Sequence, residues 1–178
     1  VFLFFDYDVH QTNLGKADDG DVINQMLESF DNETENGKLY ISYPMVEALR
    51  DFEAGKCGNG DNCFVEISDL AEYKNISSRN SLNPHFRDYN IDVWKEIVDV
   101  FSMRISCLLG NAEIISYEQY LDEANPHDIF ICEQALAGNN KVFIISAFPE
   151  FLVDYFGMKL WRTCVKHAKN QLDICNCK

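Results

Sequence analysis

The acid pair Asp6 and Asp8 follows directly on the apolar run VFLFF at residues 1–5. Side chains two residues apart on an extended chain point to the same face, so both carboxylates can converge on one point. Carboxylate oxygens suit Mg²⁺ or Mn²⁺, which fills the rest of its coordination shell with water and phosphate. We therefore expect Asp6 and Asp8 to hold a divalent metal ion. The alternative is that Asp6 caps the following turn while Asp8 is solvated.

A third acidic residue, Glu47, lies in the segment YPMVEAL, just after a predicted strand at 39–43. In open α/β sheets, ligands bind outside the carboxyl ends of the strands. Glu47 would therefore share a crevice with the acid pair if the two strands are neighbours, although a glutamate in a first helical turn also simply complements the helix dipole. His10, two residues beyond Asp8, could reach a metal or a scissile phosphate, or be an ordinary loop residue.

The elements that position these residues alternate between strand and helix. Residues 1–6 and 39–43 predict strands, while 22–30 and 44–55 predict helices, the second with Pro44 in its first turn. This alternation predicts an α/β fold with a mainly parallel central sheet flanked by helices.

The rest of the chain predicts a loop, helices and one further buried strand. The stretch at 75–90 is polar and turn-rich without a helical period, whereas 91–109 is the clearest amphipathic helix. The other predicted elements are a short strand at 63–67, helices at 117–124 and 126–138, the buried strand at 141–148, and helices at 149–157 and 158–172. We expect one α/β domain over 1–178, with the metal-site half in 1–55 and the loop and helical part in 56–178.

The composition is globular and strongly acidic. The 178 residues are 47% hydrophobic, and 29 Asp and Glu stand against 15 Lys and Arg, for a net charge of −14. Such a charge opposes non-specific nucleic-acid binding, which draws on Lys and Arg. A polyanionic substrate would need a local basic face, a metal ion or a partner subunit. The apolar runs are too short to span a bilayer, and no signal peptide is visible, so we expect a cytoplasmic protein without membrane contact.

Seven cysteines are present. Cys107, Cys132 and Cys164 lie in apolar helical segments and are expected to be reduced core residues. The other four, Cys57, Cys63, Cys175 and Cys177, have the spacings C-x5-C and C-x-C, which are not those of a usual zinc knuckle. Ordinary thiols are the favoured interpretation, with structural zinc as the alternative.

The order strand, D-x-D, helix, strand, Glu resembles the later half of a Toprim fold. The resemblance depends on the stretches VFLFFDYDVH and LYISYPMVEAL and covers about residues 1–52. They are most similar to the overcoming-lysogenization-defect (OLD) type of nuclease domain of bacterial anti-phage systems. Residue by residue, Asp6 and Asp8 match the acidic pair of that family and Glu47 matches its later glutamate.

The resemblance implies a Mg²⁺- or Mn²⁺-dependent phosphodiesterase that cleaves DNA or RNA as an effector in phage defence, with a partner protein and possible homo-oligomers. Such domains carry another catalytic glutamate on a strand before the D-x-D strand, and that element is absent from this sequence. We therefore expect that a preceding N-terminal segment is missing here.

Two other functions stay open. One is a catalytically degenerate Toprim-like interaction module whose acidic surface binds a partner. The other is a haloacid-dehalogenase-like phosphotransferase, to which the early D-x-D and Ser146, at the end of the strand VFIIS, have a loose resemblance. Ser146 is otherwise simply a small residue at a strand end.

Overall fold

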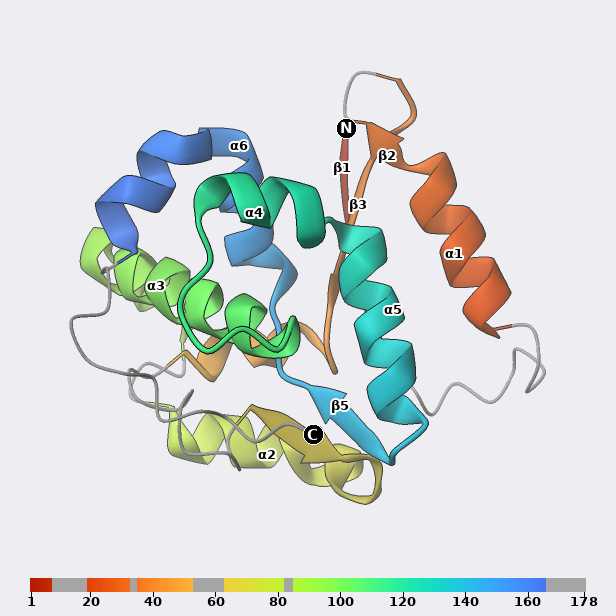
Figure 1. Cartoon of the computed structure of the whole chain (residues 1–178). Coiled ribbons are helices and arrows are strands. Elements are labelled where there is room, and N and C mark those ends of the chain that lie inside the picture. The colour runs from red at the N-terminus through yellow and green to blue at the C-terminus, as the bar shows by residue number, and fades with distance from the viewer. Residues whose placement is uncertain (8–18, 33–34, 53–62, 82–84, 166–178) are drawn as a thin grey trace.

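The computed structural model describes residues 1–7, 19–32, 35–52, 63–81 and 85–165. This part of the chain forms a mixed α/β structure (Figure 1). Its helices are α1 (Asp19–Ser29), α2 (Leu70–Asn80), α3 (Ile91–Leu108), α4 (Tyr117–Glu123), α5 (Pro126–Ala137) and α6 (Ala147–Cys164). Its strands are β1 (Phe2–Asp6), β2 (Asp31–Asn32), β3 (Gly37–Ser42), β4 (Phe64–Glu66) and β5 (Lys141–Phe143), and its 3₁₀ turns are η1 (Val46–Arg50), η2 (Ile67–Asp69) and η3 (Phe86–Asp88).

The first two predicted strands pair as expected. β1 lies parallel to β3 in a register that runs from Phe2 opposite Lys38 to Asp6 opposite Ser42. The sheet as a whole is mixed and not mainly parallel, because the short β2 is antiparallel to β3 and the order is β1-β3-β2. β4 and β5 form a separate antiparallel sheet.

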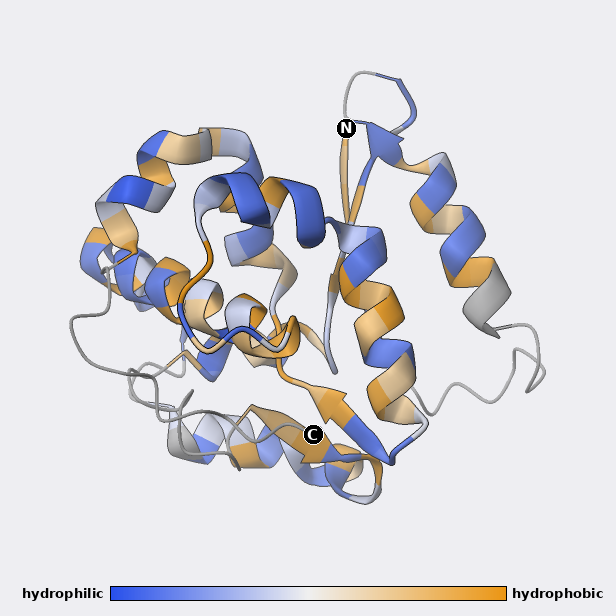
Figure 2. Cartoon of the chain, viewed as in Figure 1, coloured by the Kyte–Doolittle hydropathy of each residue, from blue (hydrophilic) through white to orange (hydrophobic). Residues whose placement is uncertain are grey.

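Helices cover β3 from two sides. α6 packs on β3 and on α3, whereas α1 and α5 pack on each other and on β3 (Figure 1). β1 and most of β5 are apolar along their length (Figure 2). The core is built from fully buried side chains of β3, α5 and β5, among them Leu39, Tyr40, Phe130 and Phe143. In the part of the chain described above, no helix is both long and apolar enough to cross a membrane.

Helix starts follow the local sequence. Asn90 accepts hydrogen bonds from the backbone N–H groups of Asp92 (2.9 Å) and Val93 (3.0 Å), and so caps α3. Asn125 caps α5 in the same way, with Pro126 as its first helical residue. These caps satisfy backbone donors that a helix cannot pair internally, which is why the 91–109 and 126–138 predictions are close to the observed bounds.

The predicted helix at 44–55 is wrong in extent. Pro44 follows a cis bond from Tyr43, Met45 is extended, and only the 3₁₀ turn η1 forms, over Val46–Arg50. Tyr43 is held by backbone hydrogen bonds to Ile145, so the chain cannot enter a helix at Pro44. Residues 53–55 lie outside the described residues.

The prediction of an irregular polar stretch at 75–90 is also wrong in its first part, which belongs to α2. The buried residues of this helix are Leu70, Tyr73 and Ser77, at a spacing of three and four. A serine occupies the third position of the buried face, and a hydropathy count therefore misses the period.

The predicted strand at 141–148 is shorter, and the two predicted helices that follow it are joined. β5 ends at Phe143, and α6 begins at Ala147. Within α6, Gly157 has a φ of 64°, a left-handed value that favours glycine, and it breaks the helix where the predicted boundary lies. Residues 166–172 lie outside the described residues.

Asp154 anchors α6 to the sheet and to α4. Its Oδ2 accepts hydrogen bonds from Lys38 Nζ and from the Tyr40 hydroxyl (3.0 Å), and its Oδ1 accepts one from the Tyr120 hydroxyl (2.9 Å). One carboxylate therefore serves three donors from β3 and α4.

We expect Asp154→Ala to lower the free energy of unfolding by about 3 kcal/mol, because it leaves a lysine and two tyrosine hydroxyls without their acceptor. Urea denaturation measures this. Lys95→Ala is the matched control, since it breaks the exposed 3.0 Å ion pair between Lys95 and Asp92 and should cost about 1 kcal/mol or less. Equal losses in the two variants would contradict the anchoring role of Asp154.

Candidate metal centre

The carboxyl ends of β1 and β3 meet at one edge of the sheet. Asp6 lies opposite Ser42 in the parallel register, and the Tyr7 N–H donates to the Ser42 carbonyl (2.9 Å). The Ser42 hydroxyl oxygen accepts from the Ala147 N–H (3.2 Å), which brings the start of α6 to the same edge. The two strands are therefore neighbours, as predicted, and Asp6 is exposed at the carboxyl end of β1.

A pocket of about 270 Å³ lies beside Asp6, between β1, β3 and α1. It is lined by Phe5, Asp6, Tyr7, Ile23, Met26, Leu39 and Ile41, so Asp6 is its one charged lining residue. Apart from Asp6, the described lining is apolar or aromatic, so Asp6 is the described side chain there that could bind a cation.

Glu47 lies in η1 and faces α2. Its side chain is 7% exposed, and its Oε1 is 3.2 Å from Lys74 Nζ, whose own side chain is largely exposed. A second contact between the same two elements lies nearby, since the Tyr73 hydroxyl donates to Asp51 Oδ2 (2.7 Å). Burial, and next the charge of Asp51, raises the pKa of Tyr73 well above its ordinary value. Glu47 thus has a counter-ion on α2.

The other two predicted site residues, Asp8 and His10, lie outside the described residues. Within the described ranges, no three His, Cys, Asp or Glu side chains form a group that could hold a metal ion. Asp6 lies beside the pocket between β1, β3 and α1, whereas Glu47 faces α2, so the two predicted ligands that the structure describes are directed towards different elements.

The cysteines give no further ligand set in the described part of the chain. Cys63 and Cys164 are buried, Cys107 and Cys132 are partly buried, and no disulfide joins any two of these four. Of the three residues predicted to be reduced core cysteines, Cys164 is therefore in the core, while Cys107 and Cys132 lie at its margin. Cys57, Cys175 and Cys177, the remaining members of the alternative zinc set, lie outside the described residues.

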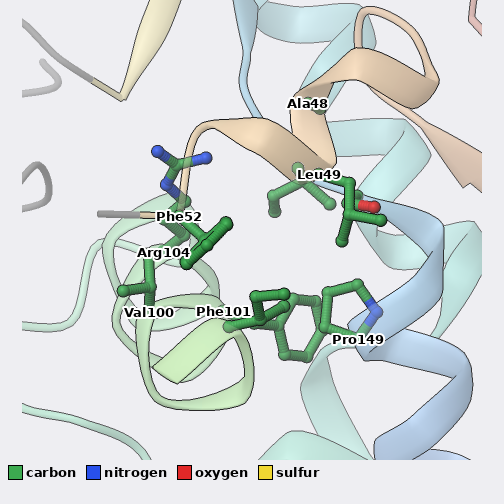
Figure 3. A pocket seen from close by; sticks show the side chains of 10 residues that line it. Ala48, Leu49, Phe52, Val100, Phe101, Arg104 and Pro149 are labelled. Carbon is green, nitrogen blue, oxygen red and sulfur yellow. The ribbon is translucent and has the colours of Figure 1, made fainter. Parts of the chain in front are cut away.

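A second pocket, of about 260 Å³, was not predicted from the sequence. It lies between η1, α3 and the start of α6, and includes Leu49, Phe52, Phe101, Arg104, Ser146 and Pro149 in its lining. Figure 3 shows Phe101 and Pro149 facing Leu49, with the Arg104 guanidinium beside Phe52 at the edge. The sequence does indicate that Arg104 is directed towards the core, because it lies three residues after Phe101 and therefore on the apolar face of α3.

Arg104 is a buried cation. It is 4% exposed, and its Nη1 donates to the Ile144 carbonyl (2.9 Å), while Nε and Nη2 have no hydrogen-bond partner. Its charge lowers the pKa of Tyr73 against the effects of burial and of Asp51. Arg104 therefore contributes to the electrostatics of the η1–α2 contact near Glu47.

Two buried glutamates were also missed by sequence reasoning. Glu133 and Glu150 are 0% and 1% exposed, and each has one carboxyl oxygen without a hydrogen-bond partner. Burial raises the pKa of both carboxyls well above the ordinary value of 4.5, with a further increase at Glu150 from Asp154. Burial therefore favours the protonated, neutral form of both side chains.

Both glutamates influence Tyr43, whose buried hydroxyl has no hydrogen-bond partner among the described residues. Burial, and next the negative charge that Glu133 and Glu150 carry when ionised, raises the pKa of Tyr43. The Phe143 N–H donates to Glu133 Oε2 (3.0 Å), which offsets part of the burial effect on that glutamate. Because burial disfavours their charged forms, Glu133 and Glu150 are less suited to a hard cation than the exposed Asp6.

No family model, curated protein or solved structure matches this chain. Function must therefore be inferred from the residues and their geometry.

The raised pKa of Glu133 makes stability depend on pH. In the unfolded chain this carboxyl ionises near its ordinary pKa of 4.5, whereas in the folded protein it stays protonated. The folded state then binds more protons, so stability falls as the pH rises from about 4.5 towards the folded-state pKa, by up to about 1.4 kcal/mol per pH unit.

We expect Glu133→Gln to remove this loss, because glutamine is neutral and can still accept from the Phe143 N–H. The variant should gain stability over the parent protein as the pH is raised from about 5 to about 8, as measured by urea denaturation at each pH. Glu123→Gln, at an exposed position on α4, serves as the control. A stability difference for Glu133→Gln that does not change with pH would contradict a neutral buried Glu133.

Proposed function

We propose that this protein is a divalent-metal-dependent phosphodiesterase of Toprim type that acts on DNA or RNA. The observation that carries the proposal is the parallel pairing of β1 with β3, because it places Asp6 at the carboxyl edge beside a small pocket. Ligand sites of open α/β sheets lie at such edges. The resemblance extends the proposal to a cytoplasmic nuclease effector of phage defence with a partner protein.

The donor chemistry fits a hard divalent cation. Asp6 is exposed, and Mg²⁺ takes one or two carboxylates plus water and phosphate. Asp6 and Asp8 would hold the ion, with Glu47 as a further ligand directly or through water. When bound, such an ion activates water and stabilises charge on the transferring phosphate. His10 would contact the scissile phosphate.

The surroundings of Glu47 contain two cations and two carboxylates. Lys74 pairs with Glu47, and Arg50 in η1 donates to the Ser78 hydroxyl on α2 (2.6 Å). The Arg50 guanidinium also lies 4.9 Å from the centre of the Phe86 ring. Because Glu47 and Asp51 lie at the same contact, these cations do not form a basic face by themselves, and a polyanionic substrate would depend on the metal ion or on a partner subunit.

The catalytically degenerate Toprim-like interaction module is the second candidate function because of one observation. Glu47 is already neutralised by Lys74, and a glutamate held in an ion pair is a weaker metal ligand than a free one. In that case the acidic surface would bind a protein partner without metal chemistry.

The phosphotransferase alternative gains no support. The Ser146 hydroxyl oxygen accepts from the Phe148 N–H (3.4 Å) and caps α6, and β5 lies in the antiparallel sheet with β4 and not beside β1.

We expect the protein to bind Mn²⁺ in calorimetric titration and to cleave DNA or RNA only with Mg²⁺ or Mn²⁺. Asp6→Asn should weaken metal binding by about tenfold or more and abolish cleavage, because it removes one charged ligand. Glu47→Gln should reduce cleavage more than metal binding if Glu47 acts through water. Thermal unfolding of each variant shows whether the fold is kept.

Asp31→Asn, at an exposed carboxylate of β2, is the matched control and should leave binding and cleavage unchanged. Full metal-dependent cleavage in an Asp6→Ala, Asp8→Ala double variant would rule out the phosphodiesterase site. Absence of metal binding by the unmodified chain would favour the interaction module.

A further inference from the structure

One edge of the Arg104 guanidinium has two donors without a partner. Nη1 donates to the Ile144 carbonyl (2.9 Å), and this bond orients the group. Nε and Nη2 are buried and have no hydrogen-bond partner among the described residues. These two nitrogens lie on the same side of a guanidinium, so their N–H groups form the parallel pair that receives the two oxygens of a carboxylate. Arg104 therefore presents an oriented pair of donors for an oxyanion.

Arg104 also has no counter-ion among the described residues. It is 4% exposed, an arginine in a protein stays protonated, and the described ion pairs do not include it. The acids of the neighbouring η1–α2 contact have partners of their own. Glu47 pairs with Lys74 (3.2 Å). Asp51 accepts from the Tyr73 hydroxyl (2.7 Å). Because a buried charge without a counter-ion is costly, an anion bound at the free edge of Arg104 would stabilise this region.

The pocket that Arg104 lines is otherwise mostly apolar. It is the pocket between η1, α3 and the start of α6, and its apolar lining includes Leu49, Phe52, Phe101 and Pro149, all of them buried. We call it the Arg104 pocket. Figure 3 shows Leu49 on one side and Phe101 and Pro149 on the other, with the Arg104 guanidinium at the edge. A ligand that fits this arrangement has an apolar body and one polar group at the arginine.

The charges around the Arg104 pocket favour a ligand with a single negative charge. Among the described lining residues, Arg104 is the one charged group. The other polar lining residue, Ser146, accepts from the Phe148 N–H (3.4 Å) as the N-cap of α6. The pocket therefore borders the positive end of the α6 dipole, which also favours an anion. One negative charge on the ligand balances the arginine, whereas a second would remain unpaired.

We propose that the Arg104 pocket binds a small monocarboxylate with an apolar tail. The carboxylate accepts from Nε and Nη2 of Arg104, in the bidentate geometry that is frequent in arginine–carboxylate pairs. The tail lies between Leu49, Phe101 and Pro149, because enclosed apolar surface favours an apolar ligand. The proposal depends on this pocket alone and not on metal binding.

Other anions match the Arg104 pocket less well. A phosphate ester carries about −1.5 to −2 at pH 7 and three acceptor oxygens, whereas Arg104 offers one positive charge and two free donors. A chloride ion has no tail and leaves the apolar lining without contact. Because the lining residues are buried, the ligand is a small molecule and not the surface of another macromolecule.

NMR titration of the full 178-residue chain in metal-free buffer tests the proposal. The probes are acetate, butyrate and hexanoate, the alcohol of each chain length, and inorganic phosphate. We expect the acids to shift the amide signals of Leu49, Val100 and Phe101, with an affinity that rises about threefold per methylene until the tail fills the pocket. The matching alcohol should bind about tenfold more weakly or less. Absence of binding by every acid, equal binding of acid and alcohol, or tighter binding of phosphate overturns the proposal.

Arg104→Lys and Arg162→Lys form a matched pair of variants. Lysine keeps the positive charge but lacks the paired donors of the guanidinium edge. We expect Arg104→Lys to weaken binding of the best acid by about tenfold or more and to leave the affinity for the matching alcohol unchanged. Arg162→Lys, at an exposed position near the end of α6, should leave both affinities unchanged. Equal losses in the two variants overturn the proposal.

The Nε–H signal of Arg104 gives a direct measurement that needs no substitution. In the unmodified chain this signal should shift when the acid binds and stay in place with the alcohol, because only the carboxylate contacts Nε. An acid that shifts the amide signals of the pocket without moving the Arg104 Nε–H signal overturns the proposal. Thermal unfolding checks the fold of both variants, and if Arg104→Lys does not fold, the Nε–H measurement decides alone.

Discussion

The reciprocal backbone pair between Tyr43 and Ile145 is the contact on which the arrangement of the two sheets depends. The Tyr43 N–H donates to the Ile145 carbonyl (2.7 Å) and the Ile145 N–H donates back (2.9 Å). These two bonds join the end of β3 to the residues between β5 and α6, although the sheets share no ladder. The same pair of bonds sets the direction in which the chain enters η1 and the position at which α6 begins. Because backbone groups buried without partners are costly, this junction also accounts for the early end of both strands.

The junction divides the acids of the molecule into two kinds. Glu133 and Glu150 are buried and influence Tyr43, and burial favours their neutral form. Asp6 is exposed at the end of its strand, and Glu47 reaches a lysine at the surface. Burial disfavours the charged form of the first kind, and charged carboxylates are the ones that attract a divalent cation strongly. A carboxylate next to an apolar run therefore has opposite chemical consequences, depending on how deeply the folded protein buries it.

Much of the framework could be predicted because it depends on local signals. The parallel neighbours β1 and β3, the helix after Asn90 and the break at Gly157 follow from apolar period, caps and glycine. The helix at 44–55 could not be judged from its own residues, since the partner that holds Tyr43 is Ile145, about a hundred residues away. Ser77 concealed the buried face of α2. For the candidate site, the sequence indicated Asp6 and Glu47, but the Lys74 counter-ion has no local signature, because it depends on a tertiary contact between η1 and α2.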